Sequence, residues 1–147
     1  MKKTISLILT VVMLFSCMAV LASADGLEPE ESSMASLRYK KLSNCWAGLV
    51  STGSGWYDVT GGAGSANGTV SISVTVILQR FNTDSITFWD DIVTLTDTNQ
   101  YSASCGTQRY IATPGVYRTH TIANVYDRAT GDFIETATAN SDHITIK

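Results

Sequence analysis

Two histidines and one glutamate are the residues of this chain whose types best suit catalysis or metal binding. His120 and His143 are the only imidazoles in the sequence, and Glu135 lies between them. On a strand that bends near residues 140–142, the three side chains could bind a metal ion or transfer protons. The alternative is that each histidine is a surface residue that only forms hydrogen bonds. A small metal-dependent or hydrolytic site around His120 and His143 is therefore one hypothesis for function.

The usual signatures of enzymes and of cofactor sites are absent from the sequence. It contains no His-Glu-x-x-His, no Cys-x-x-Cys, no Gly-x-Ser-x-Gly and no phosphate-binding loop. The glycines within residues 61–68 are followed by neither a lysine nor a helical pattern, so they indicate a loop. Asp90 and Asp91 are neighbours on an expected strand, where their side chains point to opposite faces and cannot act as a pair. We therefore predict a protein without enzymatic activity, cofactor or metal.

An aromatic pair in a glycine-rich segment suggests ligand binding instead. Trp56 and Tyr57, followed by Asp58, lie within the stretch STGSGWYDVTGGAGSANG, residues 51–68. Sugar-binding β-sandwiches stack pyranose rings on exposed aromatic faces and bind the hydroxyl groups with polar side chains such as that of Asp58. The alternative is that both rings fill the core, where we also expect Trp89. Carbohydrate binding through Trp56, Tyr57 and Asp58 is the second hypothesis.

The cysteines and the first residues indicate export. Lysines at positions 2 and 3, an apolar run over residues 5–20 and the small residues before Asp25 are typical of a secretory signal peptide, so we expect residues 1–24 to be cleaved off. Lipidation of Cys17, or an uncleaved membrane anchor, are the alternatives. Cys45 and Cys105 remain after cleavage, and in an exported chain they are expected to form one disulfide; two buried free thiols are the alternative.

Charge limits the partners of the mature chain. The formal charge of −3 becomes −5 after cleavage, because the leader contains two lysines and no acid. No clusters of lysine or arginine are present, so nucleic-acid binding is not expected. We predict a secreted or cell-surface protein that is not held in a membrane once its signal is removed.

The elements that position these residues are strands. Residues 25–41 form a tether that could be partly helical, and residues 42–147 have the Ser, Thr, Val, Ile and aromatic composition of a β domain. Within 70–81, VSISVTVILQRF, apolar and polar residues alternate, which predicts a strand with one face against a core. We therefore predict an all-β fold, an immunoglobulin-like or related β-sandwich of about seven antiparallel strands. An up-and-down barrel is the alternative.

A hairpin near the end of the chain offers a surface for a partner. Residues 116–126 and 132–138 flank the turn Arg128-Ala129-Thr130-Gly131. This turn predicts a register in which Asn124 faces Glu135 and His120 faces Ala139. One face of the hairpin then carries apolar side chains, which are Ile122, Tyr126, Phe133, Ala137 and Ala139. Binding of a protein partner, or self-association, through Tyr126 and Phe133 is our first hypothesis for function.

The same hairpin resembles known domains. Pro114-Gly115-Val116-Tyr117, followed by alternation, a glycine hairpin and a final strand, resembles the last two strands of fibronectin type III and immunoglobulin-like domains. The resemblance implies that the hydroxyl of Tyr117 bonds back to nearby backbone, as the tyrosine corner does in those domains.

A wider resemblance covers most of the mature chain. A leading strand that ends in Leu78-Gln79-Arg80, a tryptophan about ten residues later and Gly115-x-Tyr117-Arg118 are similar to small secreted bacterial proteins grouped as a domain of unknown function. The resemblance implies the fold and the compartment, and it assigns no activity. The sequence as a whole predicts a secreted binding module whose ligand is a protein or a glycan.

Overall fold

The computed structural model describes residues 39–147, which form strands and loops only. The expected signal peptide at 1–24, the alternative lipidation at Cys17 and most of the tether at 25–41 lie outside the described residues. The strands are β1 (Asn44–Gly53), β2 (Trp56–Gly64), β3 (Val70–Phe81), β4 (Trp89–Gln100), β5 (Ser102–Tyr110), β6 (Gly115–Asp127), β7 (Phe133–Asn140) and β8 (Ile144–Ile146). In this part of the chain no helix is long and apolar enough to cross a membrane.

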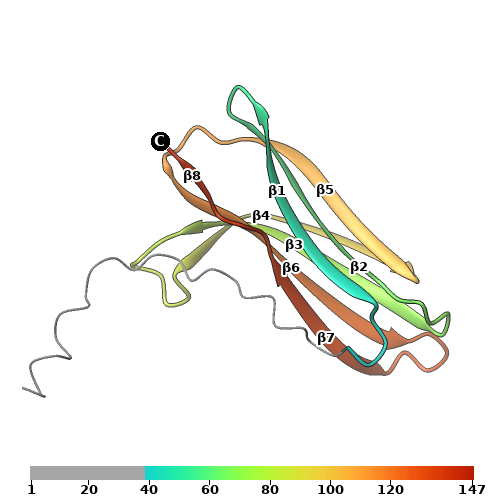
Figure 1. Cartoon of the computed structure of the whole chain (residues 1–147). Helices are drawn as coiled ribbons and strands as arrows, with labels where there is room; N and C mark the ends of the chain where they lie inside the picture. Colours follow the sequence, from blue (N-terminus) through green and yellow to red (C-terminus); the bar gives the residue numbers. More distant parts are fainter. Residues whose placement is uncertain (1–38) are drawn as a thin grey trace, which may run out of the picture. The chain divides into compact units, whose positions relative to one another are not determined.

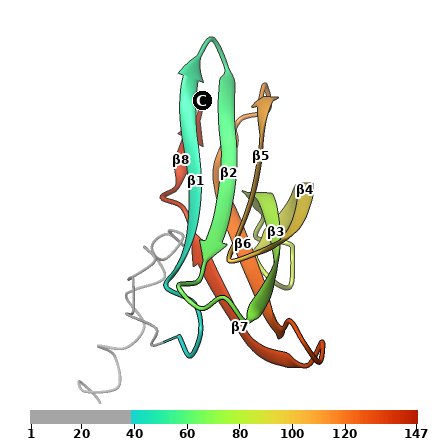
Figure 2. The same cartoon turned by 90° about the vertical axis from the view of Figure 1, so that its right-hand side faces the viewer.

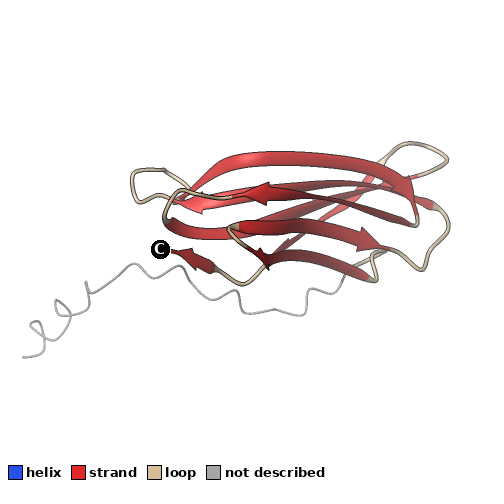
Figure 3. Ribbon diagram, turned by 90° about the horizontal axis from the view of Figure 1, so that it is seen from above, coloured by secondary structure: helices blue, strands red, loops and turns tan. Residues whose placement is uncertain are grey.

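The strands form two antiparallel sheets. The smaller sheet has the order β1-β2-β5, and the larger has the order β4-β3-β6-β7, with β8 also paired to β6. Figures 1 and 2 show the two sheets as separate layers, and Figure 3 shows that strands and loops make up the described fold. The predicted β-sandwich is therefore confirmed, and the alternative of a single up-and-down barrel is wrong.

Strand β3 supplies the centre of the core, as its alternation predicts. Val70, Ile72, Val74, Val76 and Leu78 are almost completely buried, whereas the intervening residues lie on the outer face. They pack against buried residues of the smaller sheet, which are Leu49, Val59, Ala63 and Ala103. Burial of each large aliphatic side chain stabilises the fold by roughly 1.5–3 kcal/mol. The hydrophobic effect across this one strand therefore holds the two sheets together.

The middle of the core is shaped by a glycine and two threonines. A Cβ atom at Gly61 would lie 2.7 Å from Val76 Cγ2, so only glycine allows the sheets to approach this closely. Thr119 and Thr121 of β6 are fully buried opposite the smaller sheet. Their Oγ1 atoms have no hydrogen-bond partner among the described residues. Burial of an unbonded hydroxyl opposes folding, so these two threonines lower the stability of the domain.

The loop before β6 is fixed by a tyrosine. Tyr117 is buried, and its hydroxyl donates a hydrogen bond of 2.9 Å to the carbonyl oxygen of Thr113. This is the bond to nearby backbone that was expected for Tyr117. The bond lies at the end of the sandwich where β8 pairs with the first residues of β6.

At the other end of β6, a carboxylate holds the first described residues. The Glu135 carboxylate accepts hydrogen bonds from the backbone amides of Lys40, Lys41 and Leu42, at 2.7, 2.7 and 3.0 Å. Partial burial alone would raise the pKa of Glu135, but these three bonds and the charge of Lys40 hold it below its usual value. The chain therefore enters the domain through a charge-assisted contact with β7.

A β-bulge changes the predicted register of the last hairpin. Val125 pairs with Glu135, but Tyr126 pairs with Phe133, so Ile134 is an extra residue. The prediction that Asn124 faces Glu135 and His120 faces Ala139 is therefore wrong, because each pairing is shifted by one residue. Asn124 faces Thr136 and His120 faces Asn140. The shift also places Ala137, predicted on the apolar outer face, in the core.

Candidate functional site

The outer face of the smaller sheet carries exposed aromatic rings at one end. Trp56 is 46% exposed and lies beside Tyr110 of β5, which is 58% exposed, with ring centroids 5.7 Å apart. Asp58 lies on the same face, between Val50 and Gln108. Trp56 and Asp58 therefore both lie on one exposed surface, as carbohydrate binding through them requires. Tyr57 points the other way and packs against the core, so it cannot contact a ligand on this face.

A third ring lies at the far end of the same face. Trp46 of β1 is 44% exposed and pairs with Gly62 of β2. A Cβ atom at Gly62 would lie 3.0 Å from Trp46 Cε2, so the absence of a side chain lets the indole lie over β2. Six residues of β2 separate Gly62 from Trp56, which corresponds to roughly 20 Å. An extended ligand about 20 Å long could therefore contact Trp46 at one end of the face and Trp56 at the other.

Glycines lower the surface between the rings. The middle row across the three strands is Gly48, Thr60 and Gly106, so Thr60 is its only side chain. We call this surface the aromatic face, and it consists of Trp46, Gly48, Val50, Trp56, Asp58, Thr60, Gly62, Gly106, Gln108 and Tyr110. Trp46 and Tyr110 were not predicted as binding residues, but the alternation of side chains along their own strands could have indicated their face. Trp46 and Gly48, like Gly106 and Tyr110, are an even number of residues apart and so share a face.

The residues of the first hypothesis lie on the larger sheet. Phe133 is 59% exposed and packs edge-on against the half-buried Tyr126, with ring centroids 5.9 Å apart. They form one aromatic pair beside the turn between β6 and β7. The rest of the predicted apolar surface is reduced, because Ala137 is buried. The hairpin therefore offers a smaller apolar patch than was predicted.

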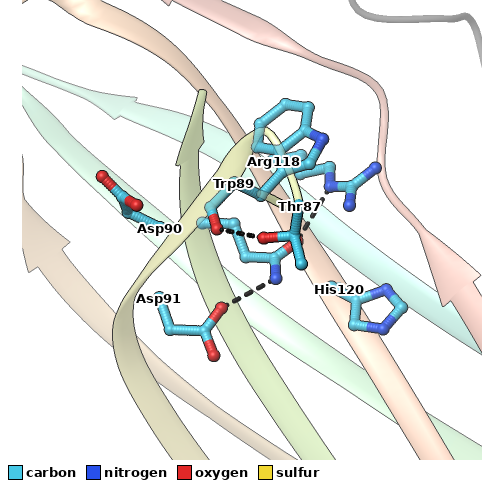
Figure 4. A pocket seen from close by; sticks show the side chains of 7 residues that line it. Thr87, Trp89, Asp90, Asp91, Arg118 and His120 are labelled. Atoms are coloured by element: carbon cyan, nitrogen blue, oxygen red, sulfur yellow. Dashed lines mark hydrogen bonds between the residues drawn. The ribbon is translucent and has the colours of Figure 1, made fainter. Parts of the chain in front are cut away.

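A hollow opens on the outer face of the larger sheet near the β3–β4 turn. It has a volume of about 560 Å³ and is lined by Gln79, Thr87, Trp89, Asp90, Asp91, Arg118 and His120. Figure 4 shows Asp91 and His120 on opposite sides of the hollow, with Arg118 and Trp89 along one edge. Gln79 accepts a hydrogen bond of 2.9 Å from Arg118 Nε and donates one of 2.8 Å to Asp91. These three side chains therefore form a fixed polar row across β4, β3 and β6.

The placement of Trp89 corrects a prediction. Trp89 was expected in the core, but it is half-buried on the outer face, where it pairs with Phe81 and lies under the Arg118 guanidinium. The cause is a second bulge, because Leu78 pairs with Val93 whereas Gln79 pairs with Asp91. One extra residue reverses the faces of the strand. Val93 therefore packs on the core while Trp89 does not.

The residues expected to share a metal or acid–base site are not brought together. Glu135 pairs with Val125, whose side chain points to the inner face of the sheet. His120 lies an odd number of residues from Val125 on the same strand, so its side chain points to the outer face. His143 stacks on Trp89 with ring centroids 5.4 Å apart, and His120 Nδ1 lies 2.6 Å from Asn140 Oδ1. Across residues 39–147, no three His, Cys, Asp or Glu side chains are placed to hold a metal ion.

The expected disulfide is absent, and the strand order explains why. Cys45 and Cys105 are free. They lie on β1 and β5, the two edges of the smaller sheet, with β2 between them. Two strand spacings separate their backbones by roughly 10 Å, which is too far for a disulfide. Burial raises the pKa of the Cys45 thiol to about 11, so this thiol is protonated at neutral pH.

No protein family, curated protein or solved structure matches this chain. The residues and their geometry are therefore the basis for assigning a function.

Proposed function

We propose that this protein is an exported, non-enzymatic β-sandwich module that binds carbohydrate through the aromatic face of its smaller sheet. The observation that carries the proposal is the exposure of Trp46, Trp56 and Tyr110 on one surface with a low glycine row between them. Large aromatic side chains are usually buried, and the C–H faces of sugar rings stack well on exposed ones. The signal-peptide pattern at residues 1–24 supports export.

The polar groups of the aromatic face suit a glycan better than a protein surface. Asp58 and Gln108 are neighbours on adjacent strands and supply hydrogen-bonding groups next to Trp56. Sugar hydroxyls bond to such side chains while the ring stacks on the indole. The spacing of roughly 20 Å between Trp46 and Trp56 favours an extended oligosaccharide over a single sugar.

The strand order supports a place among immunoglobulin-like sandwiches. The sheets β1-β2-β5 and β4-β3-β6-β7 have the arrangement A-B-E and C′-C-F-G of such domains, with Tyr117 at the start of the sixth strand. Sandwiches of this type serve many extracellular proteins as binding modules, and that general use is consistent with the proposal.

The test is binding to a panel of immobilised oligosaccharides and polysaccharides. We expect the wild-type domain to retain at least one glycan, and Trp56→Ala and Trp46→Ala each to weaken binding at least tenfold. Phe133→Ala is the matched control, since it removes a more exposed ring from the other sheet. Unchanged binding by both tryptophan variants, or no binding by the wild type, would refute the proposal.

Protein binding through the final hairpin is the second candidate, favoured by the exposure of Phe133 beside Tyr126. It predicts self-association or partner capture that is lost in Phe133→Ser and kept in Trp56→Ala. Sedimentation velocity over a range of protein concentrations measures the self-association directly.

A further inference from the structure

The Arg118 guanidinium is a partly buried cation that contacts an amide oxygen and an indole ring. Its Nε donates to Gln79, and its central carbon lies 4.0 Å from the centre of the Trp89 ring. Within residues 39–147 no carboxylate forms an ion pair with it. Burial lowers the pKa of Arg118, but a guanidinium stays charged at neutral pH. A cation that is partly removed from water and left unpaired is costly, and a bound anion offsets that cost.

The guanidinium is also held in one orientation. Gln79 is buried, and its amide is fixed at both ends because it accepts from Arg118 and donates to Asp91. With Nε occupied and the guanidinium carbon over the Trp89 ring, the terminal nitrogens are left for a ligand in the hollow (Figure 4). A guanidinium fork of this kind matches the two oxygens of a carboxylate. Fixing it in advance reduces the entropy lost on binding.

The other lining groups restrict the kind of anion. Asp91 lines the hollow and repels a second negative charge on a ligand, whereas the carboxylate of Asp90 accepts a hydrogen bond of 2.7 Å from Asn82. Asp91 Oδ1 accepts from Gln79, which leaves Oδ2 to accept from a ligand hydroxyl. His120 Nδ1 contacts Asn140, so Nε2 is the ring nitrogen left for a ligand. The lining therefore favours a ligand with one negative charge and neighbouring hydroxyl groups.

We propose that this hollow binds the carboxylate of an acidic sugar, such as a hexuronic acid unit. The carboxylate pairs with the Arg118 guanidinium, and the hydroxyl groups of the sugar ring donate to Asp91. The volume of about 560 Å³ accommodates a ligand of this size. The site lies on the opposite sheet from the aromatic face and does not depend on the function proposed for that face.

The experiment is an NMR titration of the domain with sodium glucuronate at low ionic strength. We expect the Arg118 Nε–H and Trp89 indole signals to shift in a saturable way. Glucose, which lacks the charge, should leave them unchanged, and inorganic phosphate should bind at least tenfold more weakly than glucuronate. Equal effects of glucose and glucuronate, or tighter binding of phosphate, would overturn the proposal.

Variants test the residue assignment. Arg118→Gln should weaken glucuronate binding at least tenfold, whereas Arg128→Gln removes an exposed charge and should not change it. If Arg118→Gln fails to fold, Arg118→Lys tests the assignment instead. It keeps the positive charge but lacks the two-pronged guanidinium, so it should bind glucuronate at least threefold more weakly. The shifts are read at the Arg118 Nε–H and the Trp89 indole, which lie on the sheet opposite the aromatic face, so they report on this site separately from that face. Full affinity in Arg118→Gln or Arg118→Lys would contradict the assignment.

Discussion

Replacement of Glu135 by glutamine should release the first described residues from the domain. In the native structure three backbone amides of residues 40–42 donate to one carboxylate. Hydrogen bonds to a charged group contribute about 1.5–3 kcal/mol each, so three contribute roughly 6 kcal/mol. Ordering three residues of backbone costs about 1–2 kcal/mol each, or roughly 4 kcal/mol. The contact therefore favours the bound segment by about 2 kcal/mol, and most of this should be lost in Glu135→Gln.

Amide hydrogen exchange measures this local change directly. A loss of about 2 kcal/mol corresponds to exchange roughly 30-fold faster at Lys40, Lys41 and Leu42. Amides in the middle of β3 should exchange at the wild-type rate, because they report on global opening. Asp132→Asn is the matched control, since it removes an equal charge from an exposed position in the same hairpin. Unchanged protection in Glu135→Gln, or an equal loss in Asp132→Asn, would refute the reasoning.

The same contact sets a pH dependence. The pKa of Glu135 is lower in the folded protein than its ordinary value of 4.5. Its contribution to stability is therefore fully present above that value, and it is lost as the pH falls through the lower, folded pKa. We expect the Leu42 amide signal of the wild type to shift in this acidic range and that of Glu135→Gln to stay constant. A wild-type shift centred near neutral pH would contradict the assignment.

Three further predictions concern the core and the thiols. Thr121→Val should raise the free energy of unfolding by about 1–2 kcal/mol in urea titrations, because it removes a buried hydroxyl without a partner among the described residues; a lower denaturation midpoint would contradict this. Tyr117→Phe should lower that free energy by about 1 kcal/mol through loss of the bond to Thr113, whereas Tyr110→Phe, at an exposed ring, should have no effect. Cys45 should react with iodoacetamide much more slowly in the native protein than in urea at neutral pH, since its pKa is about 11; equal rates would show that the thiol is accessible and ionised.

The sandwich could be predicted because its central signal is local. Alternation over residues 70–81 fixes which face of β3 is buried, and the structure confirms the strand at both ends. The bond from Tyr117 to nearby backbone was expected from the resemblance of its hairpin to known domains, and it joins residues four positions apart. Local patterns of this kind depend on side-chain direction along a single strand.

Features that depend on the pairing of strands could not be predicted. Two bulges, each of one extra residue, place Trp89 outside the core and Ala137 inside it. No residue type in either strand indicates that a bulge occurs there. The spacing of Cys45 and Cys105 likewise does not indicate that β2 lies between them. Only part of the aromatic face was predicted. Trp56 was proposed as a binding residue from the sequence, whereas its partner Tyr110 lies on a strand more than fifty residues later.

The two attachment points on β6 have a mechanical consequence. Residues 40–42 are bonded to Glu135, which pairs with Val125 near one end of β6, and β8 pairs with Gly115 at its other end (Figure 1). These points are ten residues apart, or roughly 33 Å. A pulling force applied between residue 40 and Lys147 therefore runs along the length of β6, from the Glu135 contact at one end to the β8 pairing at the other. The Glu135 contact, which contributes about 2 kcal/mol, should break before the strands of either sheet separate, so it would release the first described residues while the sandwich stays folded.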